Sequence, residues 1–147
     1  MNYFDALPLP QMLSDYPIGP DFVRRFTVIS RDELHDLQNR RFLRVMERAW
    51  KIPFYQRLWS ARGIEAPDIR GIHDLGRLPV YEKGDLMRSV EAHPPLGDYH
   101  GMDTYVPGSR PPVVFHSTSG TTGRPQPLFF GAYSREIQNL LLARACL

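Results

Sequence analysis

The stretch that decides the fold is residues 113–130, which read VVFHSTSGTTGRPQPLFF. Its two ends, residues 113–116 and 128–130, are short runs of β-branched, aromatic and other apolar side chains, which are typical of β-strands. Between them, residues 117–125 are rich in serine, threonine and glycine, which is typical of a loop. The sequence therefore predicts two strands joined by a polar loop.

This loop has the composition of an anion-binding segment. Gly120 and Gly123 allow the backbone to turn tightly and to bring its N–H groups close to a ligand. Five hydroxyl groups lie within residues 117–122, and the Arg124 guanidinium can bind two phosphate oxygens at once. The loop is not a Walker A motif, because the spacing Gly-x-x-x-x-Gly-Lys-Ser/Thr does not occur. By composition alone, a Gly-rich hairpin turn with solvated hydroxyls is the alternative.

The order of residues in the loop resembles a known motif. Residues 116–125 resemble the Ser-Ser-Gly-Thr-Thr-Gly-Lys-Pro phosphate-binding loop of the adenylate-forming enzyme superfamily, and His116 indicates its phenylacetate–CoA ligase-like branch. The sequence departs from the motif where Thr118 replaces a serine and Arg124 replaces a lysine, and Gln126 stands where threonine is common. Arginine keeps the charge but changes the reach and the geometry of the contact.

The resemblance extends upstream, over roughly residues 34–147. The upstream positions that follow the opening pattern of this branch are Leu37, Gln38, Arg41, Val45, Ala49, Pro53, Phe54, Tyr55, Gly63, Ile64, Asp68, Ile69, Leu75, Leu78, Pro79, Lys83, Asp85 and Leu86.

The resemblance implies a two-step ligase. A carboxylic acid, in this branch typically an aryl acid such as phenylacetate, reacts with ATP to give an acyl-adenylate and pyrophosphate, and coenzyme A then displaces AMP. The loop would hold the β- and γ-phosphates, with Mg²⁺ sharing their charge. The implied cofactor-binding residues are the hydroxyl contacts Thr118, Ser119, Thr121 and Thr122, the backbone contacts Gly120 and Gly123, and the cationic contact Arg124.

Members of this family are several times longer than this chain. Their adenine pocket, most of their acyl pocket and their catalytic lysine have no counterpart among these residues, so no catalytic residue is assigned. The sequence predicts the N-terminal portion of a carboxylate–CoA ligase, inactive by itself, which is either truncated or completed by a separate C-terminal polypeptide. The alternative is a non-catalytic remnant or an interaction module of a split enzyme.

The predicted fold class is α/β, or α+β for the portion alone. Residues 1–29 are predicted to be a loosely ordered lead-in without helices, because prolines interrupt them repeatedly. Residues 30–147 are predicted to be part of an AMP-binding adenylation domain, in which helices precede the strand–phosphate loop–strand segment. The predicted helices span residues 30–50, 54–62, 85–90 and 133–147, with a helical turn at 72–75.

Two of these helices carry apolar stripes. In the first, the stripe consists of Leu34, Leu37, Phe42, Val45 and Ala49. In the last, the apolar side contains Ile137, Leu140, Leu141 and Ala145. Left uncovered in a partial chain, the face formed by Ile137, Leu140 and Leu141 is expected to drive self-association, which would give a homo-oligomer.

Composition excludes several other classes. The chain has 147 residues and a formal net charge of +2, without the block of basic residues that nucleic-acid binding requires. It contains no apolar run long enough to cross a bilayer and no secretory signal pattern, so a cytoplasmic protein without a membrane partner is expected. The single cysteine, Cys146, excludes an intrachain disulfide, and the histidines are not spaced as metal ligands, so no metal site is expected.

Overall fold

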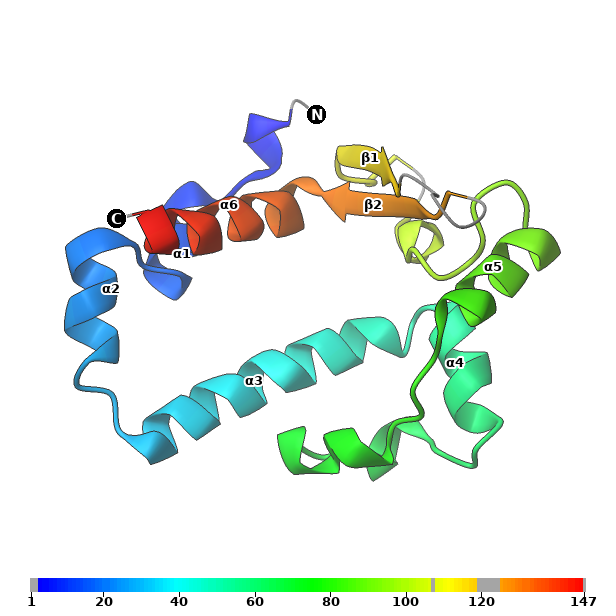
Figure 1. Cartoon of the computed structure of the whole chain (residues 1–147), viewed down its shortest axis with the longest axis horizontal. Coiled ribbons are helices and arrows are strands. Elements are labelled where there is room, and N and C mark those ends of the chain that lie inside the picture. The colour runs from blue at the N-terminus through cyan, green and yellow to red at the C-terminus, as the bar shows by residue number, and fades with distance from the viewer. Residues whose placement is uncertain (1–2, 107, 119–124, 147) are drawn as a thin grey trace. The chain divides into compact units, whose positions relative to one another are not determined.

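The computed structural model of the chain describes residues 3–106, 108–118 and 125–146 (Figure 1). The chain divides into two compact units. Residues 1–30 and 109–147 form the first, which we call the split unit, and residues 31–108 form the second, the central unit. The sequence instead predicts that residues 30–147 belong together in one domain.

The central unit is helical. Its α-helices are α3 (Arg31–Ala49), α4 (Pro53–Ser60) and α5 (Lys83–Ala92). Short 3₁₀ helices η2 (Ala66–Asp68), η3 (Ile72–Arg77) and η4 (Met102–Thr104) connect or follow them. The helices predicted before residue 100 are therefore confirmed, with α4 ending two residues earlier and α5 beginning two residues earlier than predicted.

The core of the central unit consists of the buried side chains of Met46, Trp59 and Ile69. On α3, Met46 is 6% exposed whereas Val45, which was expected in the apolar stripe, is 64% exposed. At 3.6 residues per turn, Met46 lies about 40° to one side of Phe42 and Val45 about 60° to the other. The buried face of α3 is thus rotated toward Asn39, whose Oδ1 accepts a hydrogen bond from the Ile72 N–H at 2.8 Å.

The end of α4 is formed as its sequence predicts. Pro53 lies in the first turn, where its missing N–H is not needed. After the helix, the Ile64 N–H donates to the Trp59 carbonyl at 3.1 Å and the Gly63 N–H donates to the Ser60 carbonyl at 2.9 Å. Gly63 has a φ of +70°, the left-handed conformation that this type of helix end requires.

The split unit consists of two segments, one before and one after the central unit in the sequence, and both contain helices. In its first part are η1 (Phe4–Ala6), α1 (Leu9–Asp15) and α2 (Gly19–Phe26). The prediction that residues 1–29 lack helices is therefore wrong. Pro10 and Pro20 do not interrupt α1 and α2 but lie in their first turns, where proline is tolerated.

The second part of the split unit contains the predicted strands and the last helix. Strands β1 (Val113–Ser117) and β2 (Pro127–Gly131) pair in antiparallel register, from Val113 opposite Gly131 to Ser117 opposite Pro127. Helix α6 (Ala132–Cys146) follows β2 directly. The two strands and the helix are confirmed, whereas residues 119–124 of the intervening loop lie outside the described residues.

The lead-in covers part of α6. Leu7, Met12 and Ala132 form a buried cluster, against which Ile137 and Leu140 pack. The face of α6 that was expected to be uncovered is therefore partly covered within the same chain. In contrast, Leu141 is 46% exposed and contributes little to this core. No helix among the described residues is long and apolar enough to span a membrane.

Candidate functional site

The base of the predicted phosphate loop is closed by hydrogen bonds between Thr118, which follows β1, and Gln126, which precedes β2. The Thr118 N–H donates to the Gln126 carbonyl at 3.1 Å, which extends the β1–β2 ladder by one pair. The Gln126 N–H donates in return to Thr118 Oγ1 at 3.0 Å, so a side chain takes the place of the backbone acceptor. This bond uses the hydroxyl of Thr118 as an acceptor, and its proton remains able to donate to a ligand.

The other predicted site residues are not placed. Ser119, Gly120, Thr121, Thr122, Gly123 and Arg124 lie outside the described residues, and their contacts stay predictions. What the structure adds is the scaffold that carries them. Sequence reasoning assigned Thr118 a ligand contact but did not anticipate its bond across the loop base.

The hairpin that carries the loop is fixed at its opposite end as well. The Ala132 N–H donates to the Pro112 carbonyl at 3.1 Å, and the side chain of Ala132 is 1% exposed. Across the strands, the rings of Phe115 and Phe129 lie 5.4 Å apart between centroids. The ring of His116 lies 5.5 Å from that of Phe130 in an edge-to-face arrangement. The loop therefore extends from a hairpin that is bonded at both ends and anchored to the buried cluster of the split unit.

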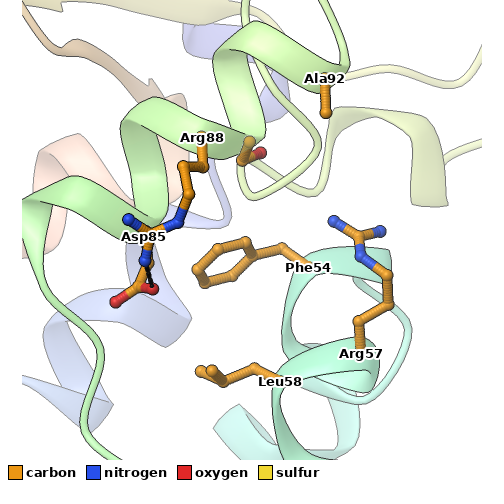
Figure 2. Close-up of a pocket in the computed structure, with 7 residues that line it drawn as sticks. Phe54, Arg57, Leu58, Asp85, Arg88 and Ala92 are labelled. Carbon is orange, nitrogen blue, oxygen red and sulfur yellow. Dashed lines mark hydrogen bonds and ion pairs between the residues drawn. The ribbon is translucent and has the colours of Figure 1, made fainter. Parts of the chain in front are cut away.

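A second candidate site lies between α4 and α5 in the central unit. It is an open pocket of about 310 Å³, with Phe54, Leu58 and Ala92 among its apolar lining residues (Figure 2). Two arginines, Arg57 and Arg88, also line it. Nothing in the sequence pattern indicated this pocket, because its walls come from helices separated by a long connection.

The charges in this pocket are already paired. Arg57 binds both carboxylate oxygens of Asp98, with Nη1 to Oδ2 at 2.5 Å and Nη2 to Oδ1 at 3.0 Å. The hydrogen bonds from Arg57 and from the Ser89 hydroxyl lower the pKa of Asp98. Arg88 is bonded to Asp85 within α5. The pocket thus presents neutralised ion pairs rather than a free cation for an anionic ligand.

Ser89 is buried but is not placed as a nucleophile. Its Oγ donates to Asp98 Oδ1 at 2.8 Å and accepts from the Asp98 N–H at 3.0 Å. The carboxylate that accepts from this hydroxyl is a weak base, because hydrogen bonds from Arg57 and Ser89 lower the pKa of Asp98, so it does not activate Ser89 as a nucleophile. These contacts hold the segment between α5 and η4 in place.

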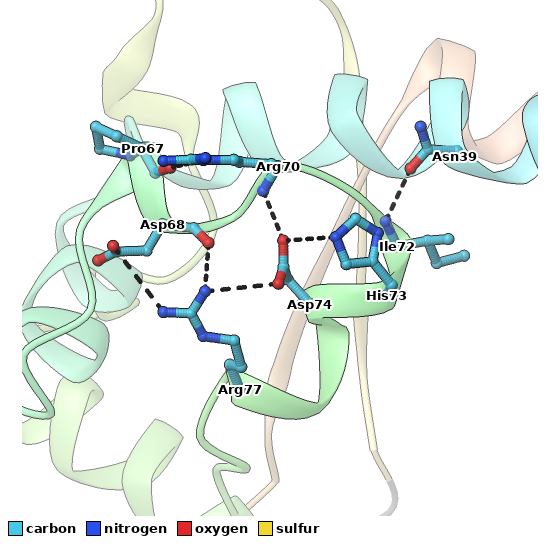
Figure 3. A network of polar contacts seen from close by, with 8 residues as sticks. All are labelled: Asn39, Pro67, Asp68, Arg70, Ile72, His73, Asp74 and Arg77. Carbon is cyan, nitrogen blue, oxygen red and sulfur yellow. Dashed lines mark hydrogen bonds and ion pairs between the residues drawn. The ribbon is translucent and has the colours of Figure 1, made fainter.

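A third polar cluster is formed around Asp74 on η3 (Figure 3). The Arg70 N–H donates to Asp74 Oδ2 at 2.9 Å, and this bond, together with Arg77, lowers the pKa of Asp74. Arg77 Nη1 also donates to the Asp68 carbonyl at 2.6 Å. The network fixes η2 to η3, which is a structural role. No group of three or more metal-ligating side chains occurs within the part of the chain that the structure describes.

Comparisons with known proteins find similarity over part of the chain. No protein-family model matches the chain. The phenylacetate-coenzyme A ligase of Escherichia coli K12 is 33% identical over 97 residues, which are 65% of this chain and 20% of that protein. The enzyme of the same name from Thermus thermophilus is 35% identical over 98 residues, which are 66% of this chain and 20% of that protein. The chain is a relative of the phenylacetate–CoA ligases.

Solved structures support the same relationship. A 2-hydroxyisobutyryl-CoA ligase in complex with 2-HIB-AMP and CoA, in an open conformation, matches 70% of this phenylacetate–CoA ligase-like chain with a TM-score of 0.56 and 33% identity. The same ligase in the postadenylation state with R3-HIB-AMP matches 80% of the chain with a TM-score of 0.58 and 30% identity. The resemblance to adenylate-forming CoA ligases is confirmed.

The match is confined to one part of these relatives. The phenylacetate–CoA ligase-like chain spans about a fifth of the length of the curated relatives, at 20%. It covers 21–24% of the solved 2-hydroxyisobutyryl-CoA ligase chains named above. Of the three candidate sites, the loop between β1 and β2 carries the motif on which the resemblance was first based.

Proposed function

We propose that this chain is the N-terminal portion of an ATP-dependent carboxylate–CoA ligase, which forms an acyl-adenylate and then an acyl-CoA thioester. The observation that supports the proposal is the pairing of β1 with β2, which brings Thr118 and Gln126, on either side of the motif's central residues, together in a relative of phenylacetate–CoA ligases. We further propose an aryl acid such as phenylacetate as the carboxylic acid substrate. ATP and coenzyme A as substrates imply a cytoplasmic protein.

The role of the loop follows from the chemistry of its donors. Phosphate oxygens accept hydrogen bonds, and the loop offers hydroxyl, backbone N–H and guanidinium donors in one short segment. Thr118, Ser119, Thr121 and Thr122 would donate through hydroxyls, Gly120 and Gly123 through the backbone, and Arg124 through its guanidinium. As negative charge builds on the departing pyrophosphate, these donors stabilise it without having to reorganise. Mg²⁺, when bound, neutralises part of the same charge.

The rest of the active site has to come from elsewhere. Since the chain spans about a fifth of its curated relatives, at 20%, the groups that bind adenine and the acyl chain belong to the remaining part of the enzyme. That part is either a continuation of this polypeptide or a separate C-terminal polypeptide. The isolated chain is therefore expected to show no acyl-adenylate formation.

A chimeric enzyme tests the proposal. The whole of this chain, residues 1–147, replaces the corresponding N-terminal part of the Escherichia coli phenylacetate–CoA ligase, so that the split unit keeps both of its segments. Phenylacetate-dependent ATP–pyrophosphate exchange is then measured. Exchange by the chimera, with none by the isolated chain, supports the ligase proposal. A chimera that is folded by circular dichroism but has no exchange activity contradicts it and favours a non-catalytic remnant or interaction module.

Within that chimera, Arg124 provides a test of the loop itself. Arg124→Ala is expected to weaken exchange by about 2–4 kcal/mol of transition-state stabilisation, by analogy with the loss of an oxyanion donor. Its free energy of unfolding should change by no more than about 0.5 kcal/mol, as for a surface substitution. Arg124→Lys is the matched control and should restore much of the activity, since the family motif has lysine there. Wild-type exchange by Arg124→Ala would show that this arginine is only a surface charge.

A further inference from the structure

Thr118 joins the two ends of the predicted phosphate loop through two different groups. Its backbone N–H donates to the Gln126 carbonyl at 3.1 Å, and its Oγ1 accepts from the Gln126 N–H at 3.0 Å. Both residues are half-buried. A single hydrogen bond tolerates a range of angles, whereas two bonds from separate groups of one residue fix how the joined segments are oriented. Thr118 therefore sets both the spacing and the orientation of the points where the loop leaves β1 and enters β2.

The second of these bonds differs from an ordinary ladder bond. In a hydrogen-bonded pair of an antiparallel ladder, two opposite residues exchange backbone bonds in both directions. Beyond the last register pair, Ser117 opposite Pro127, the next pair keeps one backbone bond and gives the other to the Thr118 hydroxyl. Closure of the loop base by two bonds thus requires a side-chain oxygen at position 118.

The donor of this bond has no substitute in the neighbouring backbone. Pro125 and Pro127 flank Gln126, and proline has no N–H, so Gln126 supplies the only backbone donor of residues 125–127. Because the bond uses the backbone of Gln126, it does not depend on which side chain stands there. The departure from the motif's threonine at position 126 therefore preserves the bond, and the change from serine to Thr118 preserves the hydroxyl.

We propose that Thr118 is a positioning residue for acyl-adenylate formation, which acts through the Gln126 N–H in addition to any contact between its own hydroxyl proton and phosphate. This inference rests on the proposed ligase function. Donors stabilise the charge on a departing pyrophosphate only if they are oriented before the reaction. A displacement of about 1 Å in such an arrangement can lower the rate by about 100-fold. The oxygen of Thr118 orients the loop, and its proton remains directed away from Gln126.

Two substitutions remove this bond from opposite sides. Thr118→Val removes the acceptor together with the hydroxyl proton, whereas Gln126→Pro removes only the donor and is tolerated sterically just before a strand. The matched controls are Thr118→Ser, which keeps the hydroxyl, and Gln126→Ala, which keeps the N–H.

In the chimera, each disrupting variant should have a kcat/KM for ATP about 10- to 100-fold below that of its control in phenylacetate-dependent exchange. The KM for ATP should rise as well, which a loss of folded protein would not cause. Since both substitutions remove the same bond, the double variant should be no slower than Thr118→Val.

Amide hydrogen exchange of the isolated chain measures the bond without catalysis. The Gln126 N–H should be protected in the wild type and in Thr118→Ser, and should lose protection in Thr118→Val. The amides of Val114 and His116, which bond to β2 in the same ladder, should stay protected and show that the hairpin is intact.

Two results would overturn the proposal. One is exchange activity of Gln126→Pro equal to that of Gln126→Ala, which would leave Thr118 only a direct phosphate contact. The other is equal protection of the Gln126 amide in Thr118→Val and the wild type. A folded wild-type chimera without exchange activity contradicts the ligase function itself, and the positioning role with it, even where the Gln126 amide is protected.

Discussion

The split unit and the central unit are stabilised over different distances along the chain. In the split unit, the Tyr3 hydroxyl bonds to Glu136, 133 residues away, and Arg144 bonds to the Pro17 carbonyl, 127 residues away. In the central unit, Arg57 and Asp98 are 41 residues apart, and most other polar contacts span fewer than ten. Closing a long loop costs more conformational entropy, although the cost rises slowly with length. The split unit therefore depends more on each contact that joins its two halves.

The two buried clusters differ in the same way. In the central unit, Met46, Trp59 and Ile69 come from consecutive elements, and the rings of Trp50 and Trp59 lie 4.6 Å apart. In the split unit, Leu7 and Met12 meet Ala132 only after residues from both ends of the chain come together. We expect substitutions in the cluster of the central unit to lower the free energy of unfolding more. Substitutions in the cluster of the split unit should instead release the N-terminal segment from the C-terminal segment.

The largest effect is expected for Trp59→Ala in the central unit. Trp59 is 5% exposed and contacts both Trp50 and Tyr55. Truncation of a buried tryptophan lowers the free energy of unfolding by about 3–5 kcal/mol. Urea denaturation measures the loss in the free energy of unfolding. Hydrogen exchange of the α4 amides shows whether the loss is located in the central unit. The control, Trp59→Phe, should lose less, and equal losses for the two variants would show that ring packing at this site is unimportant.

The next effect is expected for Met12→Ala in the split unit. Met12 lies on α1, is fully buried at 0% exposure, and packs in one cluster with Ala132 of α6. A loss of about 2–5 kcal/mol is expected for a methionine truncated in a core. Because Met12 joins residues from both halves, the amides of α1 and α6 should lose protection together while those of α3 and α4 keep theirs. Unchanged protection in α6 would show that the lead-in does not stabilise it.

Local features of the fold could be predicted from the sequence, and long-range features could not. The ends of α4 follow from Pro53 and Gly63, which act through backbone geometry within one turn. The helices α1 and α2 were missed because a proline in a first turn and a proline in a loop look alike without a buried partner such as Met12. The exposure of Val45 likewise depends on where η3 packs on α3, which periodicity alone does not specify.

The candidate site likewise has local features that the sequence can suggest and long-range features that it cannot. The phosphate-binding role of residues 116–125 rests on their resemblance to a known motif and stays a prediction, because residues 119–124 lie outside the described part of the chain. The bond from the Gln126 N–H to Thr118 Oγ1 depends on the register of β1 and β2, which only the folded hairpin defines. The bidentate pair of Arg57 and Asp98 joins two segments without any recognisable motif.

An intermediate effect is expected for Asp98→Asn. The carboxylate of Asp98 is 11% exposed on its side chain, and the bonds from Arg57 and Ser89 lower its pKa below that of an unfolded aspartate. Its contribution to stability is therefore present above the pKa of the unfolded group, about 3.9, and is lost as the pH falls through the folded value. At pH 7 the variant should lose about 1–3 kcal/mol, near the lower end because Arg57 is 53% exposed.

Urea denaturation of wild type and Asp98→Asn at neutral and at acidic pH measures this dependence. The difference between the two proteins should shrink as the pH falls below the unfolded pKa of aspartate. Ser89→Ala is the matched control, since it removes one donor to Asp98 but keeps the carboxylate and its ion pair with Arg57. A difference that is constant across the pH range would mean that the charge of Asp98 does not contribute.

The smallest effect is expected for Tyr3→Phe, which removes a hydrogen bond between residues 133 positions apart in the sequence. The Tyr3 hydroxyl donates to Glu136 Oε1 at 2.7 Å, and loss of one such hydrogen bond lowers the free energy of unfolding by about 0.5–1.5 kcal/mol. Burial and this bond raise the pKa of Tyr3, so its contribution persists below the unfolded tyrosine pKa of about 10 and is lost as the pH rises through the folded value. A double-mutant cycle with Glu136→Gln isolates the pair. If the two losses add fully, the bond does not couple the N-terminal segment to α6, and the cluster around Met12 alone joins the halves of the split unit.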